Sequence, residues 1–135
     1  MNDDIAQDGR KAIDWHARAR SFLPDGQMLV DGRRRPAASG ATFDCISPID
    51  GQLTAKVAAG DVADIDVAVA AARRAFDSGA WSRTAPRHRK QVLLRFAELL
   101  RAHGEELALT ETLDMGKPIS DSLAVDVPAT ANCIQ

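Results

Sequence analysis

The sequence predicts an α/β protein in which two β-hairpins are followed by several amphipathic helices. Two turns that contain glycine, at Asp31-Gly32 and at 48–51, each separate short runs with strand propensity. From Asp61 onward, apolar residues recur every three or four positions, which is the period of an α-helix. The 135 residues contain no long apolar strand run, so we expect no parallel sheet in this chain.

Residues 1–26 predict a helical arm. Ile13, Ala17 and Arg20 lie at helical spacing, which favours a helix from Ile5 to Phe22. Residues 27–58, which follow, predict the two hairpins.

The first hairpin is predicted to pair Met28–Val30 with Arg33–Arg35 across Asp31-Gly32. Asp-Gly is typical of a type I′ turn, because both central residues need a positive φ. The three arginines favour protection of a sheet edge against pairing with other chains, and the alternative is an anion-binding patch. The second hairpin is predicted to pair Thr42–Ile46 with Leu53–Val57.

Residues 61–135 predict a helical region. Asp61 is the expected N-cap of its first helix and Gly79 ends that helix. One face of the helix is apolar, with the residues Val62, Ile65, Val69, Ala72 and Phe76.

The next helix is predicted to begin with Thr84 as its N-cap and to break at His103-Gly104, because glycine costs about 1 kcal/mol inside a helix. Gly116 ends the helix after the break, and Pro118 prevents its continuation. One short helix is expected from Pro118 or Ile119, and a separate one from Asp126.

Asp114 lies in the last turn before Gly116, where the helix dipole is negative and a carboxylate costs roughly 0.3–1 kcal/mol. Two groups could compensate it. One is the ammonium of Lys117, three residues later, and the other is a bound cation.

The composition indicates a soluble globular protein, with a net charge of -2 and a sequence pI of about 5.9. These values imply neither a nucleic-acid partner nor an anionic membrane partner. No run approaches the roughly 18 apolar residues of a membrane span, and the polar N-terminus does not resemble a signal peptide, so we expect a cytoplasmic protein. The sequence contains none of the common phosphate-binding, nucleophile-elbow or zinc-protease motifs.

Four stretches of the sequence resemble the N-terminal region of NAD(P)-dependent aldehyde dehydrogenases. They are VDGRRRPAASGATFDCISPIDGQLTAKVAAGD, VAVAAARRAFDSGAWSRTAP, RKQVLLRFAELLRAHGEELALTETLDMGKPISDS and VDVPATANCI. The sequence looks closest to the gamma-glutamyl-gamma-aminobutyraldehyde and betaine-aldehyde type. Arg33–Arg35 and Ala85 depart from the usual family residues.

The resemblance implies the N-terminal portion of an aldehyde dehydrogenase fold, without its Rossmann-type sheet and catalytic domain, and with residues 61–135 as the helical part of the coenzyme-binding domain. It implies oxidation of an aldehyde to a carboxylate with NAD or NADP, in a dimer or tetramer of identical subunits. None of the family's catalytic or coenzyme-binding residues maps to this stretch, so the isolated chain is expected to be inactive. The alternative is a non-catalytic interaction module.

The resemblance also implies one metal site, for a monovalent cation. Its ligands here are the backbone carbonyls of Cys45 and Ile46 and the carboxylate of Asp114, and a later carbonyl lies beyond Gln135. Oxygen ligands suit such a hard cation. Cys133, beside Asn132, maps to an early helix rather than to the nucleophile loop, and we expect it to be a buried packing residue.

Overall fold

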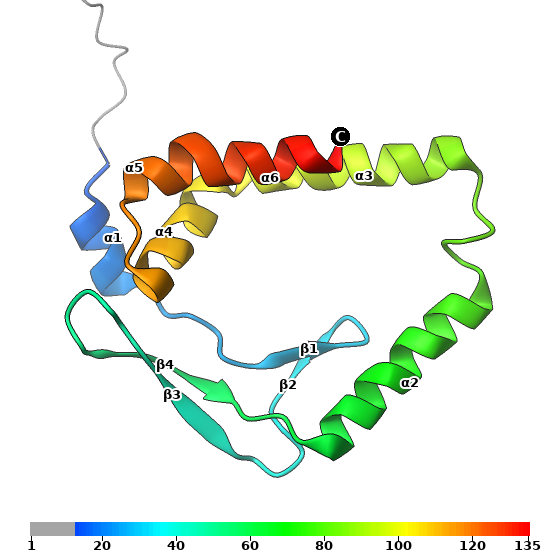
Figure 1. Cartoon of the computed structure of the whole chain (residues 1–135), viewed down its shortest axis with the longest axis horizontal. Helices are drawn as coiled ribbons and strands as arrows, with labels where there is room; N and C mark the ends of the chain where they lie inside the picture. The colour runs from blue at the N-terminus through cyan, green and yellow to red at the C-terminus, as the bar shows by residue number, and fades with distance from the viewer. Residues whose placement is uncertain (1–12) are drawn as a thin grey trace, which may run out of the picture.

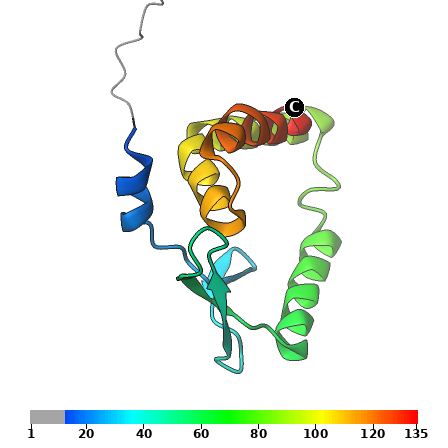
Figure 2. The same cartoon turned by 60° about the vertical axis from the view of Figure 1, so that its left-hand side comes forward.

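The computed structural model describes residues 13–135, which form two separate two-stranded antiparallel sheets and a set of helices (Figure 1). In chain order the elements are α1 (Trp15–Ser21), β1 (Met28–Val30), β2 (Arg33–Arg35), β3 (Thr42–Ile46), β4 (Leu53–Ala58), α2 (Val62–Ser78), α3 (Pro86–Ala102), α4 (Gly104–Met115), α5 (Ile119–Asp121), the π-helix η1 (Ser122–Asp126) and α6 (Val127–Ile134). Figures 1 and 2 show α3 and α6 side by side, with the hairpins at the other end of α4.

Both predicted hairpins are confirmed. Asp31 and Gly32 have φ values of 55° and 72°, as a type I′ turn requires. Two of the three arginines form ion pairs: Arg34 with Asp25 at 2.5 Å, and Arg35 with Asp64 at 3.7 Å. The side chains of this strand therefore help to attach the hairpin to its neighbours.

The helical arm is shorter than predicted where the structure describes it. Asp14 caps α1 by accepting a hydrogen bond from the backbone N–H of Ala17 at 2.9 Å, so Ile13 and Asp14 lie outside the helix. The part of the predicted helix from 5 to 12 lies outside the described residues.

The predicted ends of α2 are confirmed. Asp61 forms a capping box with Asp64, and Gly79 has a left-handed φ of 70°. The apolar face of α2 is exposed in this chain, with 76% of the Val62 surface and 67% of the Phe76 surface accessible.

The N-cap prediction for α3 is wrong. Ala85 holds that position and supplies no side-chain hydrogen bond, whereas the Thr84 hydroxyl donates to the carbonyl of Ala80 at 2.6 Å. Thr84 therefore completes the preceding turn instead of the helix start. The predicted break is confirmed, because α3 ends at Ala102 and α4 begins at Gly104.

The two separate helices predicted after Gly116 form one continuous helical segment, from Ile119 to Ile134. Its middle is the π-helix, in which the N–H of Val127 donates to the carbonyl of Ser122. Pro128 has no N–H to donate to a carbonyl four residues earlier, and the wider turn accommodates this missing bond without ending the helix.

Small residues form much of the core where α3, α4 and α6 meet. Ala97, Ala108 and Ala131 are fully buried, one from each of these helices. Alanine lets helix backbones approach closely. Among residues 13–135, none of the helices combines the length and the apolar composition needed to cross a membrane.

Candidate cation site

The C-terminal end of α4 lies against the turn of the second hairpin. Gly116 closes the helix with a φ of 76°, and its N–H donates to the carbonyl of Thr112 at 2.9 Å. A Cβ atom at Gly116 would lie 3.2 Å from Cγ of Pro48. The helix stop that the sequence predicts therefore also fits the helix against the hairpin.

This packing brings together two of the three predicted site residues. The thiol of Cys45, near the end of β3, donates to Oδ1 of Asp114 across 3.4 Å. The carboxylate of Asp114 accepts this hydrogen bond and so raises the pKa of the Cys45 thiol. The Cys45 thiol is therefore the hydrogen-bond donor of this pair, and the Asp114 carboxylate is the acceptor.

Ile46 follows Cys45 at an irregular step of the sheet. Cys45 pairs with Ala55, but Ile46 pairs with Leu53, so Thr54 is an extra residue on β4. Such a bulge locally disrupts the ladder of hydrogen bonds next to the two residues whose carbonyls are the predicted ligands.

A pocket of about 110 Å³ lies beside Cys45 and Asp114 and is also lined by Gly26 and Thr110. Sequence reasoning missed Gly26. A Cβ atom there would lie 2.0 Å from the carbonyl oxygen of Lys56, so only glycine fits this close approach to β4.

Lys117 does not compensate Asp114, contrary to one of the two readings of the sequence. Its ammonium forms an ion pair with Asp126 and lies 3.9 Å from Oε1 of Glu111. The hydrogen bond to Asp126, together with the nearby carboxylates of Glu111 and Asp121, raises the pKa of Lys117. The Lys117 ammonium therefore pairs with Asp126 and Glu111 and not with Asp114.

The donors at the predicted site fit a hard cation. Asp114 offers carboxylate oxygens, and residues 13–135 contain no cluster of three or more histidine, cysteine or acidic side chains with metal-binding geometry. One carboxylate and backbone carbonyls are ligands for a cation of low charge and not for a transition metal.

Cys133 is exposed, so the expectation of a buried packing residue is wrong. The amide oxygen of the adjacent Asn132 accepts a hydrogen bond from Arg101 at 2.8 Å. This contact ties α6 to α3, and Cys133 faces away from the packed side of α6.

Comparison with known proteins gives a consistent result. The sequence profile described as "Aldehyde dehydrogenase family" matches residues 35–135. NADP/NAD-dependent aldehyde dehydrogenase PuuC of Escherichia coli (strain K12) is 43% identical over 121 residues, which are 90% of this chain and 24% of that protein.

Solved structures agree. Indole-3-acetaldehyde dehydrogenase AldA of P. syringae, solved with NAD+ and IAA, is 59% identical with a TM-score of 0.87, over 90% of this chain and 24% of that one. Gamma-glutamyl-gamma-aminobutyraldehyde dehydrogenase of Burkholderia cenocepacia J2315 is 56% identical with a TM-score of 0.87, over 89% of this chain and 24% of that one.

The chain thus spans about a quarter of the length of these relatives and corresponds to their N-terminal part. The family match covers the second hairpin and all the helices from α2 onward. The chain belongs to the aldehyde dehydrogenase family.

Proposed function

We propose that this chain supplies the N-terminal portion of an oxidoreductase that oxidises an aldehyde to a carboxylate with NAD or NADP. The family match over residues 35–135 is the observation that carries the proposal. In this reaction the coenzyme accepts hydride from the aldehyde carbon and water supplies the second oxygen. We place the protein in the cytoplasm, as an assembly of identical subunits.

The substrate is proposed to be an amino-aldehyde. Support comes from the similarity to the Burkholderia cenocepacia enzyme and from a relative in Pseudomonas aeruginosa, aminoacetaldehyde dehydrogenase, which is 48% identical over 109 residues.

A chimera tests the proposal directly. The matching N-terminal part of the Escherichia coli relative is replaced by this chain, and NADH formation from an amino-aldehyde is followed by absorbance. We expect an active chimera and no activity from this chain alone. A folded but inactive chimera would contradict the proposal, as would NADH formation by the isolated chain that Cys133→Ala abolishes.

We also propose that the site at Asp114 holds a monovalent cation, with the Cys45 and Ile46 carbonyls as further ligands. A positive charge there would offset a carboxylate at the negative end of the α4 dipole and join the helix to the hairpin. Potassium is expected to raise the unfolding temperature, and Asp114→Asn is expected to remove that increase. An equal increase in both proteins would leave Asp114 without this role.

The exposed face of α2 favours a second candidate function, a non-catalytic interaction module. Ile65 and Val69 lie on this face with Val62 and Phe76, and an exposed apolar stripe of this size is typical of an interface. Size-exclusion chromatography tests this second candidate. A compact monomer at all concentrations would contradict an interaction module.

A further inference from the structure

Lys117 and Asp114 flank the glycine that ends α4, yet their charges do not meet. Lys117 follows Asp114 by three residues, and the ammonium of a lysine is the simplest group to neutralise a carboxylate at a helix end. In the structure the partner of Asp114 is the Cys45 thiol, and the partners of Lys117 are Asp126 and Glu111.

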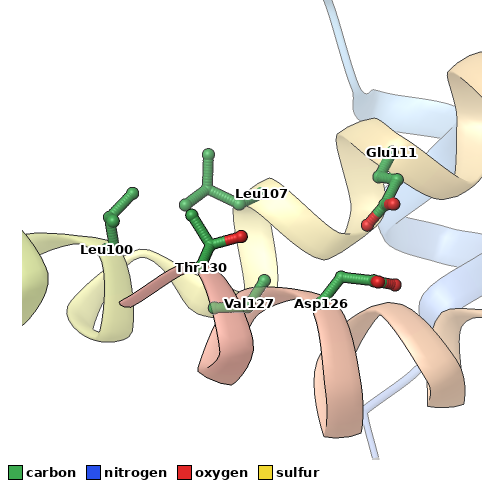
Figure 3. Close-up of a pocket in the computed structure, with 6 residues that line it drawn as sticks. All are labelled: Leu100, Leu107, Glu111, Asp126, Val127 and Thr130. Atoms are coloured by element: carbon green, nitrogen blue, oxygen red, sulfur yellow. The ribbon is translucent and has the colours of Figure 1, made fainter. Parts of the chain in front are cut away.

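The carboxylate that binds the Lys117 ammonium, that of Asp126, belongs to a different helix. Asp126 is the last residue of η1, and it accepts the hydrogen bond from the Lys117 ammonium. Glu111 of α4 contributes a second carboxylate, 3.9 Å from the same nitrogen. Figure 3 shows the carboxylates of Glu111 and Asp126 at the same end of a pocket of about 240 Å³ between α4 and the last helix.

The lysine is held more firmly than a surface residue. Its side chain is 29% exposed, and those of Glu111 and Asp126 are 30% and 33% exposed. Partly buried charges are screened less by water and salt than exposed ones, so two carboxylates around one ammonium define its position.

We propose that Asp126, assisted by Glu111, is a positioning residue that holds the Lys117 ammonium away from Asp114 and so keeps the Asp114 carboxylate available to a monovalent cation. This inference rests on the cation site proposed above. An ammonium that reached Asp114 would occupy the same carboxylate oxygens and would repel a second positive charge.

The helical segment after Gly116 contributes to this arrangement. In the π-helix each backbone N–H donates to the carbonyl five residues earlier, and Asp126 is the last residue of this segment. Asp126 thus lies at the junction of η1 and α6, where it accepts the hydrogen bond from Lys117.

The test measures potassium-dependent stabilisation of the chimera described above, which supplies the residues that follow Gln135, against unfolding, at constant ionic strength with choline replacing potassium. In Asp126→Asn, and more strongly in Glu111→Gln with Asp126→Asn, Lys117 is free to reach Asp114. We expect the potassium concentration for half-maximal stabilisation to rise about tenfold.

Lys117→Met provides the matched control. Added to Asp126→Asn, it removes the competing ammonium, so potassium binding is expected to return to within about twofold of the original protein. If the ion pair had only a structural role, Lys117→Met would not restore potassium binding, because it leaves the pair with Asp126 broken.

The outcomes separate this inference from the proposal on which it rests. If the unsubstituted chimera shows no potassium-dependent stabilisation, the cation site and the positioning role are both refuted. If the unsubstituted chimera responds to potassium but the chimera with Asp126→Asn and Glu111→Gln responds equally, only the positioning role is refuted. Failure of Lys117→Met to restore binding also refutes it.

Discussion

The buried carboxylate of Asp64 provides the strongest test of how the hairpins are joined to the helices. Asp64 is only 3% exposed. Both of its oxygens lie 3.1 Å from the backbone N–H of Ala38, and one of them accepts from the N–H of Asp61 at 3.2 Å. Arg35 of β2 lies 3.7 Å away. One side chain therefore links the loop after β2 to the start of α2.

Asp64→Ala removes the acceptor for both backbone donors. An unsatisfied donor costs about 1–3 kcal/mol, and the low end applies because Ala38 and Asp61 are exposed and water can reach them. The ion pair with Arg35 adds at most about 1 kcal/mol, since the arginine is partly exposed. We expect a total destabilisation of about 2–3 kcal/mol. Asp64→Asn keeps one acceptor oxygen and should cost about 1 kcal/mol.

Thermal unfolding followed by circular dichroism measures this effect. A loss of about 2–3 kcal/mol corresponds to a fall of about 8 °C in Tm for a domain of this size. Asp66→Ala is the matched control, because Asp66 is an exposed aspartate of the same helix. If Asp64→Ala and Asp66→Ala lower the Tm by the same amount, Asp64 does not hold the hairpin to the helix.

Two further predictions concern the backbone and pH. Gly116→Ala should lower the free energy of unfolding more than Gly40→Ala. Both residues have a positive φ, which costs about 1–2 kcal/mol for alanine. Of the two, only Gly116 has a neighbour within 4 Å of the added methyl group. Equal urea midpoints would show that the contact with the hairpin turn is unimportant. The N–H of Gln27 and the guanidinium of Arg34 hold the pKa of Asp25 below its ordinary value of 3.8, so their stabilisation is complete above that pH and is lost as the pH falls through the lowered pKa. Asp25→Asn should therefore reduce the loss of stability on acidification, and an unchanged pH profile in urea unfolding would contradict this.

Local backbone signals predicted the elements of the fold well. Asp31-Gly32 specified a hairpin turn, and Asp61, Gly79 and Gly116 specified helix ends, because each effect depends on one or two residues and their own φ angles. The prediction failed at Thr84, whose hydroxyl reached a carbonyl of the preceding turn instead of capping the next helix.

The residue pattern predicted the candidate site less well than it predicted the elements of the fold. Cys45 and Asp114 are separated by 69 positions, and it was the family resemblance, not spacing or composition, that paired them before the structure brought them together. Nothing near Gly26 or Asp64 in the sequence indicates that one approaches β4 and that the other is buried among backbone donors.

The sequence by itself determined the hairpin turns, the ends of α2 and the C-terminal end of α4, and the family to which the chain belongs. Only the tertiary structure decided which charges meet. Lys117 is near Asp114 in sequence but pairs with Asp126, nine residues away on another helix. The reason is physical: a turn or a cap is set by neighbouring residues, whereas the partner of a long charged side chain depends on how distant elements pack around it.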